Sequence, residues 1–233
     1  LLAVIVLAVI MGTIFSSKWE LFLRFTNAAS FGLVDPMYGR DISFYVFALP
    51  TYAFPQGWIF SVFLMAIAAT AIISFINFTV RGVNFTLVPS LRNQIAILGA
   101  LAILIAVLVL WIDRLQLVNS ENGVVYGATY VDVNAKKHAY LVLSALGVIA
   151  AIGVVVGSYL GRTRMAIGIV GLWVILIVAL GTGWPSLLQT FSVDPNEFAK
   201  ENEYISRNID FTRTGYGLQG LEEIFYEAEG DVT

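Results

Sequence analysis

The sequence predicts an all-α integral membrane protein with about five membrane-crossing helices. Five segments contain no Asp, Glu, Lys or Arg, and they cover residues 1–17, 42–80, 93–112, 139–161 and 165–193. Only 12% of the residues are charged and 58% are hydrophobic, whereas about 25% are charged in ordinary globular domains. A helix needs roughly 20 consecutive apolar residues to cross a hydrocarbon core of about 30 Å. These segments therefore belong in a membrane.

We expect helices at about residues 1–15, 56–79, 94–112, 138–160 and 165–184, within a transmembrane domain of residues 1–193. The first helix is too short for a full span at about 1.5 Å of rise per residue. A signal peptide would begin with basic residues and end at a small-residue cleavage site, and neither is present. We therefore expect that the first helix is truncated and that the chain is a piece of a longer protein.

The connectors between these helices predict the orientation. The connector 80–93 holds Arg81 and Arg92, and the turn 161–164 holds Arg162 and Arg164, with no acid in either. Short basic connectors stay in the cytoplasm. This places the C-terminal segment outside, together with the two long connectors 16–55 and 113–137.

The connector 16–55 has the composition of an interfacial segment. Residues 18–27 place apolar side chains on one helical face, and Glu20 and Arg24 at i,i+4 on another, which is typical of a helix lying in the plane of the interface. Aromatic residues follow at high density, and Pro36, Pro50 and Pro55 are expected to divide the rest into short pieces. An aromatic belt that anchors the chain explains this composition better than a groove for lipid or a hydrophobic substrate.

Two further groups of residues stand out. Gly153, Gly157 and Gly161 form a G-x-x-x-G-x-x-x-G ridge that predicts close packing against another helix, in this chain or a partner. Near the outer ends of the helices, polar and aromatic residues form a candidate outer-face cluster, namely Asp113, Arg114, Tyr126, Tyr130, Asp132 and His138. The simpler interpretation is that the first two mark the membrane boundary, that Asp132 caps the following helix and that the tyrosines dock at the interface.

The tail has a different character from the rest of the chain. Residues 194–233 carry ten acids and three basic residues. The sequence Asp194-Pro195-Asn196-Glu197 is typical of a helix start, and we expect a short amphipathic helix to about Asn208. We therefore expect the segment 194–233 to be the start of an acidic extracytoplasmic domain.

Composition also excludes several chemistries. The absence of cysteine excludes disulfides and thiolate sites, and the single histidine, His138, excludes a multi-histidine metal site. No nucleophile, nucleotide-binding or zinc-protease motif is present, and no basic stripe suggests nucleic acid. We therefore predict no catalytic residue, no metal and no cofactor, and bound lipid is the one ligand left open. These absences favour a protein that is not an enzyme.

Three blocks of the sequence carry a resemblance to a known family. The first is Phe31-Gly32, Asp35-Pro36 and Gly39-Arg40-Asp41-Ile42-Ser43-Phe44-Tyr45-Val46-Phe47-Ala48-Leu49-Pro50. The second is Tyr126-Gly127-Ala128-Thr129-Tyr130-Val131-Asp132-Val133-Asn134-Ala135. The third runs from Pro195-Asn196-Glu197 through Glu201, Tyr204-Ile205, Asn208-Ile209 and Thr212-Arg213 to Tyr216-Gly217-Leu218. Together they resemble the UPF0182 family of bacterial integral membrane proteins.

The resemblance implies about seven helices followed by a large extracytoplasmic region, in the inner membrane of a bacterium. It implies no established activity, so no catalytic residue is carried over. Three hypotheses for the function follow. The first is a scaffold or accessory subunit of a membrane or envelope complex, with membrane lipids and other membrane protein subunits as partners and no nucleic acid. The second is a transporter or channel for an apolar or zwitterionic substrate. The third is an envelope enzyme whose site lies in an outer domain.

Overall fold

The computed structural model describes residues 2–81, 89–121, 123 and 125–220. Within these residues the regular structure is helical, apart from one isolated bridge between Val34 and Asp41. Five helices in the described part are long and apolar enough to cross a membrane. The predicted all-α membrane fold class is therefore confirmed. Most of the basic connector 80–93 and the end of the tail lie outside the described residues.

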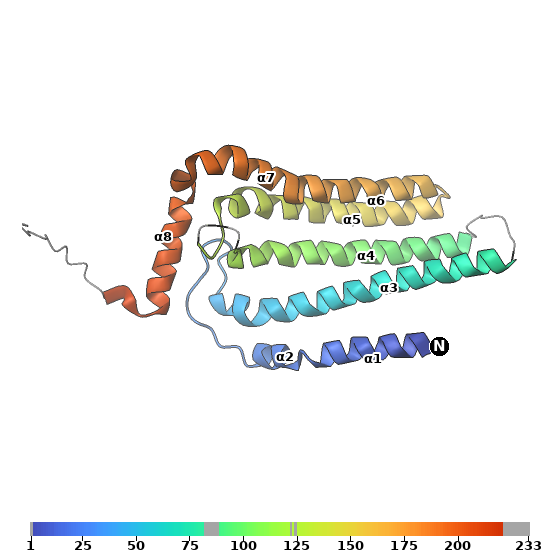
Figure 1. The fold of residues 1–233 in the computed structure, drawn as a ribbon, viewed down its shortest axis with the longest axis horizontal. Coiled ribbons are helices and arrows are strands. Elements are labelled where there is room, and N and C mark those ends of the chain that lie inside the picture. Colours follow the sequence, from blue (N-terminus) through green and yellow to red (C-terminus); the bar gives the residue numbers. More distant parts are fainter. Residues whose placement is uncertain (1, 82–88, 122, 124, 221–233) are drawn as a thin grey trace, which may run out of the picture.

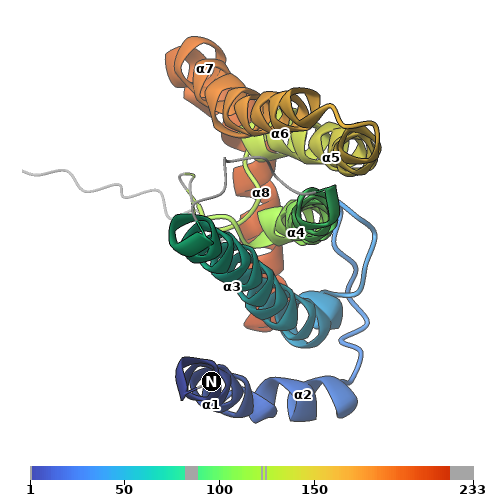
Figure 2. The same ribbon diagram turned by 90° about the vertical axis from the view of Figure 1, so that its right-hand side faces the viewer.

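The long helices lie side by side with their axes roughly parallel (Figure 1). They are α1 (Leu2–Ser16), α3 (Leu49–Arg81), α4 (Pro89–Gln116), α5 (Lys137–Tyr159) and α6 (Thr163–Val178). In the view along the bundle, α4 lies between α3 and α5, α6 covers α5, and α1 lies on the far side of α3 (Figure 2). The helices α3 and α4 extend several residues beyond the expected ranges 56–79 and 94–112.

The start of α3 corrects the expected role of two prolines. The π-helical turn η1 (Phe44–Ala48) leads directly into α3, and the helix runs through Pro50 and Pro55. Pro50 has no N–H to donate, and it directly follows η1, where the hydrogen-bonding pattern of the helix already departs from the α pattern. The hydroxyl of the buried Thr51 lies within hydrogen-bond distance of the carbonyls of Phe47 (2.9 Å) and Leu21 (3.0 Å), and the second contact joins the start of α3 to residues 19–26.

The expected interfacial helix is α2 (Trp19–Thr26), and its ion pair Arg24–Glu20 spans 2.6 Å at i,i+4. This helix contacts the start of α3 through Leu21 and Thr51, and α1 contacts α3 directly. The indole N–H of Trp58 in α3 donates to the carbonyl of Met11 at 3.0 Å, and the ring of Phe15 lies 5.3 Å from that of Trp58. Aromatic contacts, rather than interlocking small residues, therefore join α1 to α3.

The packed core lies between α4, α5 and α6. It includes the fully buried Leu143 and the buried Trp173, whose indole N–H donates to the Leu143 carbonyl at 3.1 Å. Glycines of α5 bring these helices together. A Cβ added at Gly147 would lie 2.4 Å from Val107 of α4 and 2.9 Å from Trp173 of α6. Side chains of α4 and α6 therefore pack directly onto the α5 backbone at this position, which the small residue permits.

The ridge glycines do not all play the role the spacing suggested. A Cβ at Gly153 would meet Ile169 of α6 at 2.9 Å, and one at Gly157 would meet Ala166 at 3.5 Å. Gly161 lies after the end of α5 instead, in the turn to α6, with φ of +75°. A residue in this left-handed conformation is usually glycine because a Cβ is strained there. Its role is to end the helix.

Beyond residue 184, where the predicted helix 165–184 ends, the chain stays helical through residue 193, which the sequence did not predict. The π-helical turn η4 (Ala179–Gly183) leads to α7 (Trp184–Leu188), then to η5 (Gln189–Val193), η6 (Asp194–Asn196) and α8 (Glu197–Gly215). Asp194 therefore does not cap a new helix; its carboxylate accepts from the Gln189 amide at 2.7 Å. The last helix continues to Gly215 rather than Asn208, and it lies across one end of the bundle (Figure 1).

Candidate functional site

The end of the bundle covered by α8, here called the α8 end, gathers three buried acids. Asp132 is fully buried, while Asp35 and Glu201 are exposed by only 4% and 6%. Burying a carboxylate costs several kcal/mol unless hydrogen bonds or a cation compensate. Each of the three has such partners, and together they join the segments that the sequence singled out.

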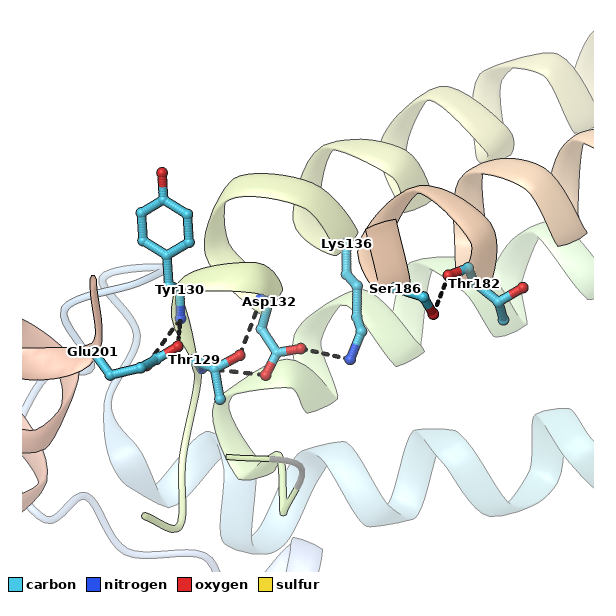
Figure 3. Close-up of polar contacts among 7 residues, drawn as sticks. All are labelled: Thr129, Tyr130, Asp132, Lys136, Thr182, Ser186 and Glu201. Atoms are coloured by element: carbon cyan, nitrogen blue, oxygen red, sulfur yellow. Dashed lines mark hydrogen bonds and ion pairs between the residues drawn. The ribbon is translucent and has the colours of Figure 1, made fainter. Parts of the chain in front are cut away.

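Asp132 caps its helix from the third position rather than as the N-cap (Figure 3). Its carboxylate accepts from the backbone N–H of Thr129 at 3.2 Å, and the Thr129 hydroxyl accepts from the backbone N–H of Asp132 at 3.2 Å. This reciprocal pair is a capping box. The second carboxylate oxygen lies 2.7 Å from Nζ of Lys136, so the buried charge is also paired. The π-helical turn η3 (Asp132–Lys136) then leads into α5.

Glu201 connects α8 to the same helix start. Its two carboxylate oxygens lie 3.1 and 3.2 Å from the backbone nitrogen of Tyr130 (Figure 3). The first N–H groups of a helix have no partner within the helix, and the helix N-terminus carries partial positive charge. A carboxylate from a distant helix therefore satisfies a donor that the local chain leaves open. Nearby, Nζ of Lys200 lies 4.7 Å from the Tyr130 ring centroid.

A second contact joins α8 to the connector before α5. The amide of Asn208 donates to the Tyr126 carbonyl at 2.5 Å, and the amide of Asn134 lies 3.5 Å from the Tyr204 hydroxyl. The rings of Tyr130 and Tyr204 meet edge to face, with centroids 6.5 Å apart. One face of α8 is thus held at several points along residues 126–134.

Asp35 and Asp41 organise the loop between α2 and η1. The Asp35 carboxylate accepts from the backbone N–H groups of Met37 (3.1 Å) and Tyr38 (2.6 Å) and from the Tyr45 hydroxyl (2.9 Å). Asp41 accepts from the Ser30 hydroxyl and from three backbone N–H groups. These hydrogen bonds, the one from Ser30 foremost, hold the pKa of Asp41 well below its ordinary value.

Tyr38 links this loop to α4 and α5. Its hydroxyl donates to the Arg114 carbonyl, and burial raises its pKa to about 12, so it stays protonated. The guanidinium carbon of Arg114 lies 5.3 Å from the ring centroids of both Tyr38 and Trp111. Nζ of Lys137 lies 5.1 Å from the Tyr38 centroid and donates to the Met37 carbonyl at 3.2 Å.

A pocket of about 450 Å³ opens beneath α8. Its apolar lining comes from the α2–η1 loop, η1, the connector before α5 and α8, and includes Ile42, Val46, Val118, Val133 and Phe211. Arg207 and Asn208 are among the polar residues at this pocket, and Arg207 is paired with Glu203. The volume falls within the range of about 300–1,000 Å³ that is usual for small-molecule sites.

The structure therefore divides the six residues of the candidate outer-face cluster. Tyr130 and Asp132 lie together with Glu201, and Tyr126 lies at the pocket. Arg114 belongs to the separate group around Tyr38, and its neighbour Asp113 is half-buried on α4. His138 is exposed on α5 and lies outside these groups. Among the described residues, no group of three or more His, Asp or Glu side chains could hold a metal ion.

Sequence reasoning missed Asp35, Thr129, Glu201, Tyr38 and Lys137. Two of these residues had a local signal. Thr129 has the spacing of a capping box with Asp132, and Asp35 precedes a proline, which is typical of a turn. Glu201 had none, because its partner lies 71 residues earlier in the chain. The contacts around Tyr130, Asp132 and Glu201 thus fix α8 to the start of the helix that leads into α5, with a pocket beside them. These residues do not form a pair of nucleophile and base.

Comparison with known proteins places these features in a family. The model of the "Uncharacterised protein family (UPF0182)" matches residues 1–233. A UPF0182 protein of Thermobifida fusca is 32% identical over 231 residues, which cover 97% of this chain and 22% of the relative. UPF0182 proteins of Clavibacter michiganensis subsp. michiganensis and Trichodesmium erythraeum are 36% and 34% identical, over 94% and 92% of this chain and 23% and 24% of their own lengths. The chain thus spans about a quarter of these relatives, and no solved structure matches it.

Proposed function

The chain belongs to the UPF0182 family, and from this premise we propose that it is the membrane-embedded part of a scaffold or accessory subunit in a bacterial envelope complex. The α4–α5–α6 core offers shape and rigidity rather than reactive groups. Its α8 end presents a surface that a further domain or a partner can use. Membrane lipids and other membrane protein subunits are its proposed partners.

The observation that carries this proposal is the docking of α8 by Glu201. A buried carboxylate from α8 caps the helix that leads into α5, so the orientation of α8 is fixed relative to the bundle. A protein that only needed an anchor would not need such a fixed angle. A scaffold does, because whatever follows or binds α8 must be held in a defined position.

We further propose that the α8 end faces outward from the plasma membrane. Arg162 in the turn between α5 and α6, and Arg164 in the first turn of α6, lie at the opposite end of the bundle (Figure 1). Short basic turns stay on the cytoplasmic side. Cysteine labelling at Thr214 near the end of α8, with Arg164→Cys at the other end, tests this orientation in intact cells, since the chain has no native cysteine. Labelling of the Arg164→Cys variant from outside the cell would show that the proposed orientation is wrong.

The function itself is tested with the full-length protein. It would be tagged, cross-linked in its own membrane and purified in mild detergent as wild type, as Glu201→Ala and as the matched control Glu203→Ala, which removes an exposed acid from the same helix. We expect a reproducible set of envelope proteins with wild type and control, and loss of that set with Glu201→Ala. Recovery of the wild type alone and monomeric would refute the scaffold.

The pocket beneath α8 supports a second candidate function, transport of an apolar or zwitterionic substrate. The packed interior counts against it, because Leu143, Ala150 and Val154 are buried where a path across the membrane would run. Reconstitution into liposomes with fluorescent amphiphiles would measure transfer between leaflets. We expect none above that of protein-free vesicles, and saturable transfer lost on filling the pocket with Ala128→Phe would favour transport over the scaffold.

A further inference from the structure

We propose that Arg114 and Lys137, which converge on the ring of Tyr38, bind the phosphate of an anionic phospholipid at the α8 end of the bundle. The two cations come from different helices. Arg114 lies in the last turn of α4, and Lys137 is the first residue of α5. Both lie within 5.3 Å of the same ring, that of Tyr38. This inference does not depend on the scaffold function.

Charge is the first argument for the site. The ion pairs within the described residues are Arg24–Glu20, Lys136–Asp132 and Arg207–Glu203. Neither Arg114 nor Lys137 belongs to one of these pairs. Two acids act electrostatically on Tyr38, but Asp35 is held by backbone N–H groups and Asp132 by Lys136, so both carboxylates are already engaged. Two cations held close together repel each other, and the repulsion is strong where water is partly excluded. An anion that contacts both cations would reduce this repulsion.

The hydrogen bonds of the two side chains leave donors for that anion. Arg114 uses Nε to donate to the Lys137 carbonyl at 3.1 Å, and Lys137 uses one N–H to reach the Met37 carbonyl. No hydrogen bond joins the Nη atoms of Arg114 to a described residue. These bonds fix the position of both side chains while the guanidinium fork keeps the geometry that suits a phosphate.

The surface below the cations indicates that the phosphate belongs to a lipid. An apolar stripe runs along α4 with helical spacing to the position of Arg114, and its members are all exposed: Ile97, Leu101, Leu104, Leu108 and Trp111. Tryptophan at the end of such a stripe is typical of the depth of the headgroups. An acyl chain can therefore lie along the stripe while its phosphate meets the two cations.

The charge also selects the class of lipid. A zwitterionic phospholipid would bring an ammonium group to a site that already holds two positive charges. A phospholipid with an uncharged alcohol headgroup, such as phosphatidylglycerol, brings only the phosphate. Basic residues near the membrane surface each favour anionic lipids by a modest amount, and two together are expected to give roughly tenfold to thirtyfold selectivity.

The test uses the purified protein and native mass spectrometry after equilibration with equimolar phosphatidylglycerol and phosphatidylcholine. We expect the wild type to retain one phosphatidylglycerol preferentially and R114Q/K137Q to lose this preference. The control K18Q/R40Q removes the same charge from the same end of the bundle and should keep it. R114K/K137R, which preserves both charges, should retain most of it.

Two outcomes would overturn the proposal. One is a wild type that retains both lipids equally, and the other is equal loss of preference in R114Q/K137Q and K18Q/R40Q, which would show a general effect of charge. Addition of millimolar inorganic phosphate distinguishes a lipid site from a free phosphate site; displacement of phosphatidylglycerol by phosphate alone would exclude the lipid. If R114Q/K137Q does not fold, the wild-type preference and R114K/K137R still decide between these outcomes.

Discussion

Replacement of Glu201 by alanine should release α8 from the bundle without unfolding the bundle. The substitution removes both acceptors of the Tyr130 N–H, which lie at 3.1 and 3.2 Å. A hydrogen bond to a charged group contributes about 1.5–3 kcal/mol. The favourable placement of a carboxylate at a helix N-terminus adds about 0.3–1 kcal/mol. The docking of α8 should therefore weaken by about 2–4 kcal/mol, which corresponds to a roughly 30-fold to 700-fold change in its equilibrium constant.

Hydrogen exchange followed by mass spectrometry measures this change directly. Amides of α8 and of residues 126–134 should exchange faster in Glu201→Ala, while those of the α4–α5–α6 core should keep their wild-type protection. Glu201→Gln retains one neutral acceptor, so it should show a smaller effect. Because the two helices are joined by this carboxylate, the Tyr130 amide itself should show the largest increase.

The control for this experiment is Glu203→Ala. Glu203 pairs with Arg207 on the exposed surface of the same helix, and such pairs contribute about 0–1 kcal/mol. Exchange in α8 should change little. If Glu203→Ala and Glu201→Ala accelerate exchange equally, the effect reflects the loss of an acidic side chain from α8 in general and not the docking of α8. If Glu201→Ala leaves the Tyr130 amide protected, the trans-capping argument is wrong.

Three further predictions concern the packing and the loops. Gly147→Ala should lower the free energy of unfolding in detergent by about 1–3 kcal/mol, because its Cβ would meet side chains of α4 and α6. The control Gly168→Ala should not lower it, because a Cβ there would meet nothing within 4 Å. Equal shifts of the thermal unfolding midpoint in the two variants would contradict this prediction. Thr129→Ala should destabilise the start of the following helix by about 1 kcal/mol, measured by exchange of the Asp132 amide, and unchanged exchange would argue against the capping box. The lowered pKa of Asp41 means that its contribution to the α2–η1 loop is present above its unfolded pKa and is lost as the pH falls below it, toward the folded pKa; exchange protection in this loop should fall with acid in the wild type and lose this dependence in Asp41→Asn.

The sequence predicted those features that depend on interactions between residues close together in the chain. Runs without charge gave the number of long helices, since any charged side chain at mid-membrane is costly, and the spacing of Glu20 and Arg24 predicted α2. Local rules failed at Pro50 and Pro55, because a π-helical turn before α3 lets the chain enter the helix ahead of them. They failed again after residue 184, where α7 and η5 continue the helix without a recognisable pattern in the residues.

The candidate site was harder to predict because its central contacts are long-range. Tyr130 and Asp132 were singled out by their unusual setting. Lys136 lies at i+4 from Asp132 and is a local partner, but Glu201 reaches Tyr130 only through the three-dimensional arrangement. The same holds for Tyr38, which meets Arg114 across 76 residues. A single sequence shows that a carboxylate is present in α8, but it cannot show which of several acids on that helix becomes buried.

Different contacts determine which segments pair within the bundle and at its α8 end, because both regions exclude water. Between membrane helices, apolar side chains gain little by leaving lipid, so close contacts at Gly147 and Gly153 and the Trp173 hydrogen bond must determine which helices pair. At the α8 end, the buried carboxylates choose the partner instead, because each one is tolerated only with its own donors. Substitutions of the first kind should therefore disturb the bundle and α8 together. Substitutions at Glu201 should release α8 alone, and this asymmetry is what a bundle that positions an outer element requires.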